Sequence, residues 1–252
     1  MMLGSFGDIA EWFIEKHNKW IENNKLVSWA GKLGISLNSN GNLNEGQLFQ
    51  LFVLAALWNN KPTYKAEKGE KVFMRIKNGY TLENFKTAAQ DNTMEGRLRE
   101  IASNIINNPQ VYKLLMFIAN GRLNGKNVWA FIKEILESPV IGNEEDDLRR
   151  LKELYGIFNP PRYHQQAYLT VKVFLIFREI RIQFREVGKY QYHPAICCVP
   201  DSNVRKALFN LGILDRIKND LNNMIKASQL MANAFCTEKY DLYDLPLFFW
   251  YK

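Results

Sequence analysis

Residues 48–57 are apolar at every position except Gln50, and this run most constrains what the chain can fold into. Asn44 and Gln47 precede it with the spacing of a capping box, which predicts a helix over residues 46–58. A helix that is apolar on all sides has to be covered on all sides. We therefore expect this segment to be the central helix of a core that other elements surround.

The rest of the chain keeps the helical period. We predict helices over residues 6–23, 65–77, 82–90, 95–107, 110–120, 127–137, 145–156, 163–187, 201–211 and 214–233. Turn and cap signals separate them, among them Asn78-Gly79, Asn108-Pro109, Asn120-Gly121 and Asn124-Gly125. No segment has the strict alternation of a half-buried strand, so the predicted fold class is all-α with short loops.

Charge and cysteine content narrow the function classes. The net charge is +7, and residues 161–206 hold eight basic but three acidic residues, which fits either a solvated helix face or a surface that contacts phosphates. Three cysteines without C-x₂-C spacing predict no disulfide scaffold, no zinc site and a reducing compartment. We see no signal peptide and no apolar run long enough to span a bilayer, so we expect a cytoplasmic protein.

Residues 199–212, VPDSNVRKALFNLG, place Pro200-Asp201 at the expected start of a helix. An aspartate there can simply cap the helix and interact with its dipole. The string also resembles the helix-hairpin-helix DNA glycosylase superfamily, in which a proline–aspartate element opens a helix and the aspartate is catalytic. Asp201 is therefore read either as a cap or as a catalytic carboxylate.

Residues 164–174 resemble the long helix of the archaeal 8-oxoguanine DNA glycosylases, which carry a lysine nucleophile and a second lysine seven positions later. Lys172 matches the second lysine, and Gln165 occupies the position of the nucleophile, or Gln166 if the register shifts by one. An amide nitrogen cannot supply the amine. Four explanations stay open: a variant with glutamine in place of the lysine, a monofunctional enzyme in which Asp201 activates water, a binder of damaged DNA that does not cut, or a different lysine such as Lys172.

The C-terminal residues 244–250, DLPLFFW, resemble the leucine-rich helix with which the archaeal enzymes hold the extruded base. Trp250 matches their tryptophan, while the matching aspartate position holds Pro246 and Asp244 lies two residues away. The hairpin before the catalytic helix, residues 154–158, keeps Gly156 only, and a divergent hairpin is typical of the archaeal branch.

The resemblance implies a two-lobed helical glycosylase, with residues 1–25 and 198–252 in one lobe and residues 26–197 in the other. It implies excision of 8-oxoguanine from double-stranded DNA and strand cleavage by β-elimination, by a monomer that associates with the nucleoid and uses no cofactor or metal. Asp201 would be catalytic, as would the residue at the nucleophile position, Gln165 or Gln166. The base would be held by Lys172, Trp250, Asp244 and Pro200. The DNA backbone would be contacted by Arg162, Arg205 and Lys206. The alternative is a non-catalytic helical module that binds damaged DNA or a protein.

Overall fold

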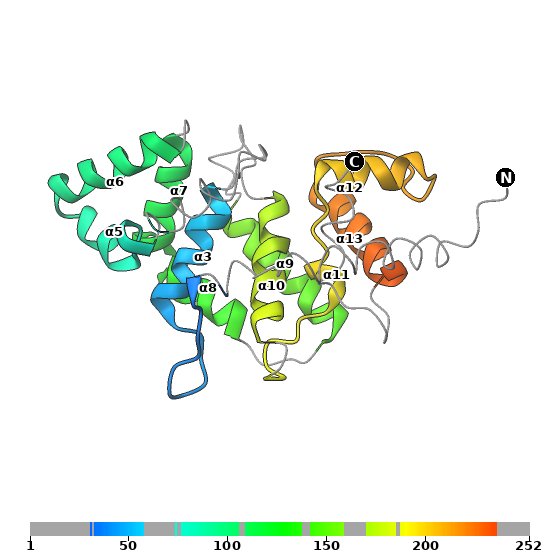
Figure 1. The fold of residues 1–252 in the computed structure, drawn as a ribbon, viewed down its shortest axis with the longest axis horizontal. Helices are drawn as coiled ribbons and strands as arrows, with labels where there is room; N and C mark the ends of the chain where they lie inside the picture. The colour runs from blue at the N-terminus through cyan, green and yellow to red at the C-terminus, as the bar shows by residue number, and fades with distance from the viewer. Residues whose placement is uncertain are drawn as a thin grey trace. The chain divides into compact units, whose positions relative to one another are not determined.

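The computed structural model describes residues 31, 33–57, 74, 77–105, 109–137, 142–158, 170–184 and 187–235. The chain divides into two compact units. Unit 1 comprises Met1–Ser28, Pro139–Lys152 and Thr170–Lys252, and unit 2 comprises Trp29–Ser138 and Glu153–Leu169. Helices make up nearly all the regular structure of the described residues, which confirms the predicted all-α class (Figure 1).

Unit 2 is built around helix α3 (Glu45–Leu57), whose side chains at positions 48–56 are all buried. Helices α5 (Leu82–Ala88) and α7 (Pro109–Asn120) pack against it, and α6 (Asn92–Ile105) packs on both of these. Helix α8 (Val128–Glu137) packs on α7. The prediction of a central helix covered on all sides is thus confirmed.

An aromatic cluster joins these helices in the core of unit 2. The ring of Phe49 meets Phe85 and Trp129 edge to face, at centroid distances of 5.4 Å and 5.3 Å. Phe52 lies 5.4 Å from Trp129 and 5.4 Å from Phe158, near the end of α9 (Glu144–Phe158). These distances lie in the range where aromatic pairs add stability beyond the area they bury.

The predicted capping box forms only by half. The Asn44 side chain accepts a hydrogen bond from the Gln47 backbone N–H at 3.2 Å, as expected of an N-cap. The Gln47 side chain instead accepts from the backbone N–H and hydroxyl of Ser36, at 2.8 Å and 3.0 Å. The reverse bond is not needed, because the Asn44 N–H already donates to the Ser36 carbonyl at 2.9 Å.

A two-stranded ribbon, which the sequence did not predict, connects α7 to α8. Strands β1 (Arg122–Leu123) and β2 (Lys126–Asn127) are antiparallel. The predicted Asn124-Gly125 turn lies between them, with φ values of +50° and +80°. Two residues per strand are too few to show an alternating pattern, so only the turn was visible in the sequence.

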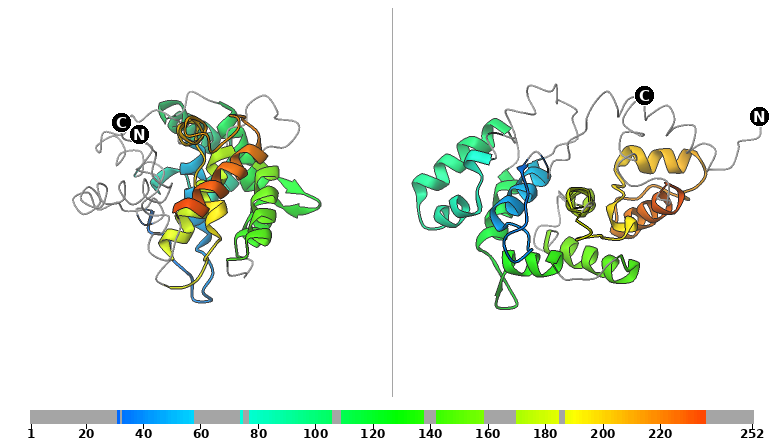
Figure 2. Two further views of the ribbon diagram at one scale, coloured as in Figure 1. Left: turned by 90° about the vertical axis from the view of Figure 1, so that its right-hand side faces the viewer. Right: turned by 60° about the horizontal axis from the view of Figure 1, so that its bottom comes forward.

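Unit 1 contains α10 (Thr170–Gln183), α11 (Pro194–Cys197), α12 (Ser202–Asn210) and α13 (Leu221–Phe235). The short α11 packs against both α10 and α13, and α12 packs against α13. Figure 2 shows these elements from two further directions. None of the helices formed by the described residues is long and apolar enough to cross a membrane.

Several boundaries differ from the predictions. The helix expected over 214–233 begins at Leu221, because Asp220 accepts a hydrogen bond from the Asn223 N–H at 2.8 Å and so caps a later start. Residues 139–152 and 170–197, expected in the central lobe, group with the C-terminal helices. The helix predicted over 6–23 and most of that predicted over 65–77 lie outside the described residues.

Candidate functional site

Asp201 is the N-cap of α12, as the sequence predicted. Its backbone is extended, with φ −66° and ψ 177°, and its Oδ1 accepts hydrogen bonds from the N–H groups of Asn203 and Val204 at 2.8 Å and 2.9 Å. Both bonds end on Oδ1, so the second carboxylate oxygen is not used by the cap. Pro200, directly before it, is buried. The capping role and a chemical role are therefore compatible, because they use different oxygens.

Arg205 holds this turn in place from inside the fold. The residue is only 3% exposed, and its Nε donates to the Pro200 carbonyl at 3.1 Å. Its terminal nitrogen donates to the Lys218 carbonyl and to the Asn219 side chain. Burial lowers the pKa of Arg205, and the charge of Asp201 opposes that shift. Arg205 is one of the two cations in this segment that were predicted to contact the DNA backbone. In the structure it is buried, and its hydrogen bonds stabilise the turn instead.

Lys206, the neighbouring cation, is exposed and remains available for such a contact. The third predicted backbone contact, Arg162, lies outside the described residues. So do both glutamines of the nucleophile slot, Gln165 and Gln166, and the two C-terminal candidates, Asp244 and Trp250. The structure therefore describes three predicted site positions beside the two cations: Lys172, Pro200 and Asp201.

Lys172 lies in the first turn of α10, next to the buried side chains of Val173 and Phe174. Burial lowers the pKa of its ammonium group to about 8, because a charged amine loses hydration there. A pKa in this range leaves a sizeable share of the lysine as the neutral, nucleophilic amine near physiological pH. The sequence drew attention to Lys172 only through the resemblance of residues 164–174, and the lowered pKa could not be predicted from it.

Lys172 and Asp201 belong to the same compact unit. The short α11 packs both on α10, which carries Lys172, and on α13, against which α12 packs. The helices that carry the two predicted site residues are thus linked through α11 and α13.

A second ionisable group in unit 1 is buried and structural. Asp147 is fully buried, forms an ion pair with Arg150 at 2.5 Å and accepts a hydrogen bond from the His193 N–H at 2.6 Å. Burial raises the pKa of Asp147, and the bonds to His193 and Arg150 oppose this shift. The sequence has four consecutive acids here, residues 144–147, and gives no sign that one of them is buried. The fourth, Asp147, links the start of α9 to the loop before α11 through its bond to the His193 N–H.

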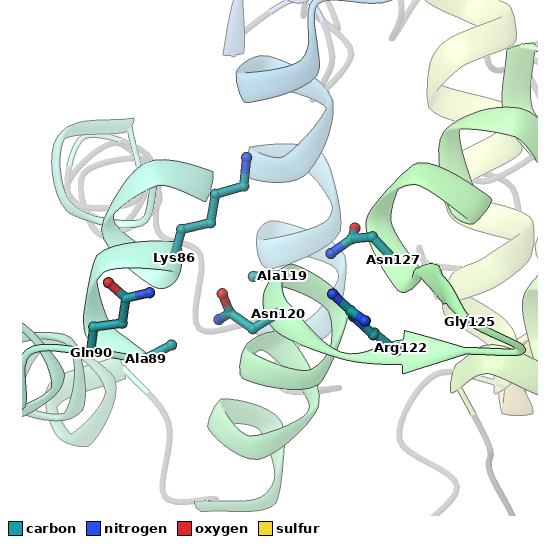
Figure 3. A pocket seen from close by; sticks show the side chains of 8 residues that line it. All are labelled: Lys86, Ala89, Gln90, Ala119, Asn120, Arg122, Gly125 and Asn127. Atoms are coloured by element: carbon teal, nitrogen blue, oxygen red, sulfur yellow. The ribbon is translucent and has the colours of Figure 1, made fainter.

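Unit 2 has a cavity that the sequence analysis missed. It lies between α5, the end of α7 and the β1–β2 ribbon, and its volume is about 460 Å³ (Figure 3). The residues that line it come from segments distant in sequence, so spacing gave no signal for it. Among the described residues, no group of histidine, cysteine, aspartate and glutamate side chains could hold a metal ion.

No protein-family model, curated protein sequence or solved structure matches this chain.

Proposed function

We propose that this protein is a DNA glycosylase and lyase that excises 8-oxoguanine from duplex DNA, with Lys172 as the amine and Asp201 as the carboxylate. The observation that carries the proposal is the partly buried position of Lys172 in the first turn of α10, where loss of hydration lowers the pKa of its ammonium group to about 8. At that pKa about a quarter of the lysine is neutral near pH 7.5, against about one part in a thousand for an ordinary lysine. An amine of this kind is what a glycosylase that forms a Schiff base requires.

The proposed reaction has two stages, displacement of the base and elimination of the phosphate. The neutral Lys172 amine attacks C1′ of the sugar, and the C1′–N9 bond breaks with its electron pair going to the base, which takes up a proton. The attacking nitrogen gives up a proton, its electron pair forms the C1′=N⁺ double bond of the Schiff base, and the C1′–O4′ bond breaks as O4′ takes up a proton. Water or the released base then removes a C2′ proton, the electrons of that C–H bond form the C2′=C3′ double bond, and the C3′–O bond breaks with its electron pair leaving on the phosphate. Asp201 stabilises the positive charge that develops on the sugar in the first step.

The second oxygen of Asp201 suits this role. Its first oxygen holds the cap of α12, so the carboxylate stays oriented while Oδ2 faces a developing charge. Arg205, which donates to the Pro200 carbonyl, keeps the turn rigid. Residues 199–212 resemble the helix-hairpin-helix DNA glycosylase superfamily, and residues 164–174 resemble its archaeal 8-oxoguanine branch, which supports oxidised guanine as the substrate. Such a base has to be flipped out of the stack before it can be excised.

Borohydride trapping on a duplex with one 8-oxoguanine tests the proposal, with an undamaged duplex as the substrate control. The native chain is compared with Lys172→Gln, Asp201→Asn and Gln165→Lys, and with Lys152→Gln as a matched exposed lysine in unit 1. We expect a covalent adduct with the native chain and with Lys152→Gln, no adduct with Lys172→Gln, and a slow reaction with Asp201→Asn.

Two outcomes contradict parts of the proposal separately. If Gln165→Lys forms the adduct and the native chain does not, the amine position is Gln165 and the assignment to Lys172 is refuted, although the glycosylase fold is supported. If no protein in the series binds or cuts the lesion, the function is refuted and the chain is a non-catalytic helical module.

A further inference from the structure

The cavity in unit 2 carries two positive charges and polar side chains. Lys86 reaches it from α5, Asn120 lies at the end of α7, and Arg122 and Asn127 point into it from the ribbon (Figure 3). None of the described residues that line it is acidic. We propose that this cavity binds a phosphate group. The inference goes beyond the proposed function, because it involves neither Lys172 nor Asp201.

The ribbon fixes the two donors on the hairpin side. Arg122 and Asn127 are directly paired across the ladder, so their side chains leave the ribbon on the same face. The Asn124-Gly125 turn, with positive φ at both positions, matches the twist of a two-residue hairpin and sets this register. The Asn127 Oδ1 accepts the Ala130 N–H at 3.2 Å and caps α8. Its amide NH₂ group is therefore the part left to donate into the cavity.

The opposite wall is held by hydrogen bonds of the fold. The Asn120 side chain donates to the Phe85 carbonyl at 2.9 Å, which joins the end of α7 to α5. Gly121 follows at once, and its N–H donates to the Phe117 carbonyl at 2.7 Å. A Cβ at Gly121 would come within 2.5 Å of Phe117, so only glycine lets β1 leave α7 this closely. These contacts hold the end of α7 and the start of β1 against α5 on this side of the cavity.

The charge balance of the cavity favours an anion. Lys86 and Arg122 are both exposed, and neither takes part in any of the ion pairs between described residues. Asp91, the next acid after Lys86, accepts the Thr93 N–H at 2.8 Å and does not line the cavity. At the end of α5, the Lys86 carbonyl accepts the Ala89 N–H at 3.3 Å and the Thr87 carbonyl accepts the Gln90 N–H at 2.9 Å.

Phosphate is an anion that this set of donors can bind with several hydrogen bonds at once. The guanidinium of Arg122 presents a planar fork that matches two phosphate oxygens, and the Lys86 ammonium adds a point charge. Side-chain amides such as those of Asn127 and Gln90 supply neutral donors. The bound phosphate group could belong either to the backbone of a nucleic acid or to a free phosphorylated small molecule. The experiment distinguishes these two sources.

The first arm measures the binding of inorganic phosphate to the protein, from the shifts of backbone amides in a ¹⁵N NMR titration. The variant Lys86→Gln/Arg122→Gln removes both cations, and Arg97→Gln/Lys113→Gln removes the same charge from exposed positions of unit 2 that do not line the cavity. We expect shifts at the ribbon amides in the native chain, and binding at least about tenfold weaker in the cavity variant only. Equal losses in both variants, or no shifts at the ribbon, would overturn the proposal.

The second arm identifies the source with an undamaged DNA duplex and adenosine monophosphate. If the phosphate comes from a nucleic acid, the cavity variant loses duplex affinity beyond the control, and its salt slope becomes shallower by about 0.9 per lost contact. If only the nucleotide affinity falls, the ligand is a phosphorylated small molecule. If neither falls, the proposal is overturned. Trapping of the 8-oxoguanine duplex, measured on the same variants, reports separately on the proposed function.

Discussion

Replacing Lys172 with methionine should stabilise the protein near neutral pH. The two side chains are of similar length, but methionine has no charge to desolvate in the first turn of α10. The pKa of Lys172 falls from 10.5 to about 8 in the folded protein. Since one pKa unit corresponds to about 1.4 kcal/mol, the buried charge lowers the free energy of unfolding by at most about 3 kcal/mol near pH 7. The partial exposure of the side chain makes this an upper bound.

The effect has a definite dependence on pH. The unfolded lysine keeps its proton up to its ordinary pKa of 10.5, whereas the folded one releases it near 8. Between these values the unfolded state binds more protons, so the stability of the native chain rises with pH in that window. From about pH 7 to about pH 9.5 the linkage relation gives a gain of about 2 kcal/mol, which the methionine variant lacks.

Urea unfolding of both proteins at the two pH values, followed by circular dichroism, measures this difference. Other titrating groups are common to both chains and cancel, including Tyr80 and Tyr192, whose pKa values burial raises. Lys152→Met is the control for loss of an exposed lysine. The difference in the free energy of unfolding between Lys172→Met and the native chain should change between the two pH values. If it is the same at both, the pKa of Lys172 is not lowered by burial and the reasoning is refuted.

Three further changes test the fold. Arg205→Met should lower the free energy of unfolding by about 3 kcal/mol, because it leaves buried carbonyl groups without a donor, whereas Lys206→Met should change it by less than about 0.5 kcal/mol in urea unfolding. Gly121→Ala should cost about 1–3 kcal/mol by pushing into the preceding turn, whereas Gly96→Ala, with open space around it in α6, should gain about 0.5–1 kcal/mol in thermal melts. Trp129→Ala should cost about 3–5 kcal/mol in urea unfolding, and a smaller loss would contradict the aromatic core.

The sequence predicted the features of the fold that depend on local pattern. The all-round apolar run at 48–57 identified the central helix, since no other placement hides it. The Asp201 cap was predictable because an aspartate after proline and before an apolar helical period is a local signal. The start of α13 was missed although Asp220 is also a local cap, because apolar residues such as Leu214 and Ile217 extend the helical period into the loop.

The candidate site was predictable only in part, because its chemistry depends on three-dimensional surroundings. The resemblance of residues 164–174 to the long helix of the archaeal enzymes drew attention to Lys172, but the burial that lowers its pKa comes from the packing of α10. Arg205 lies in a basic segment and suggested a phosphate contact, yet its partners at 218–219 are reached only through the turn that follows α12. The cavity at Lys86 is lined by residues from α5, the end of α7 and the β1–β2 ribbon. These segments are not adjacent in sequence, so no local motif predicted the cavity.

The central claim is that the Lys172 amine forms a Schiff base with the sugar of an 8-oxoguanine nucleotide. The most direct test reduces the native chain with borohydride on the lesion duplex, digests the adduct and locates the modified residue by mass spectrometry. The account predicts the sugar remnant on Lys172, with a trapping rate that rises with pH to a plateau above about pH 8, following the neutral amine. An adduct on any other lysine, or no adduct on the lesion duplex, would contradict it.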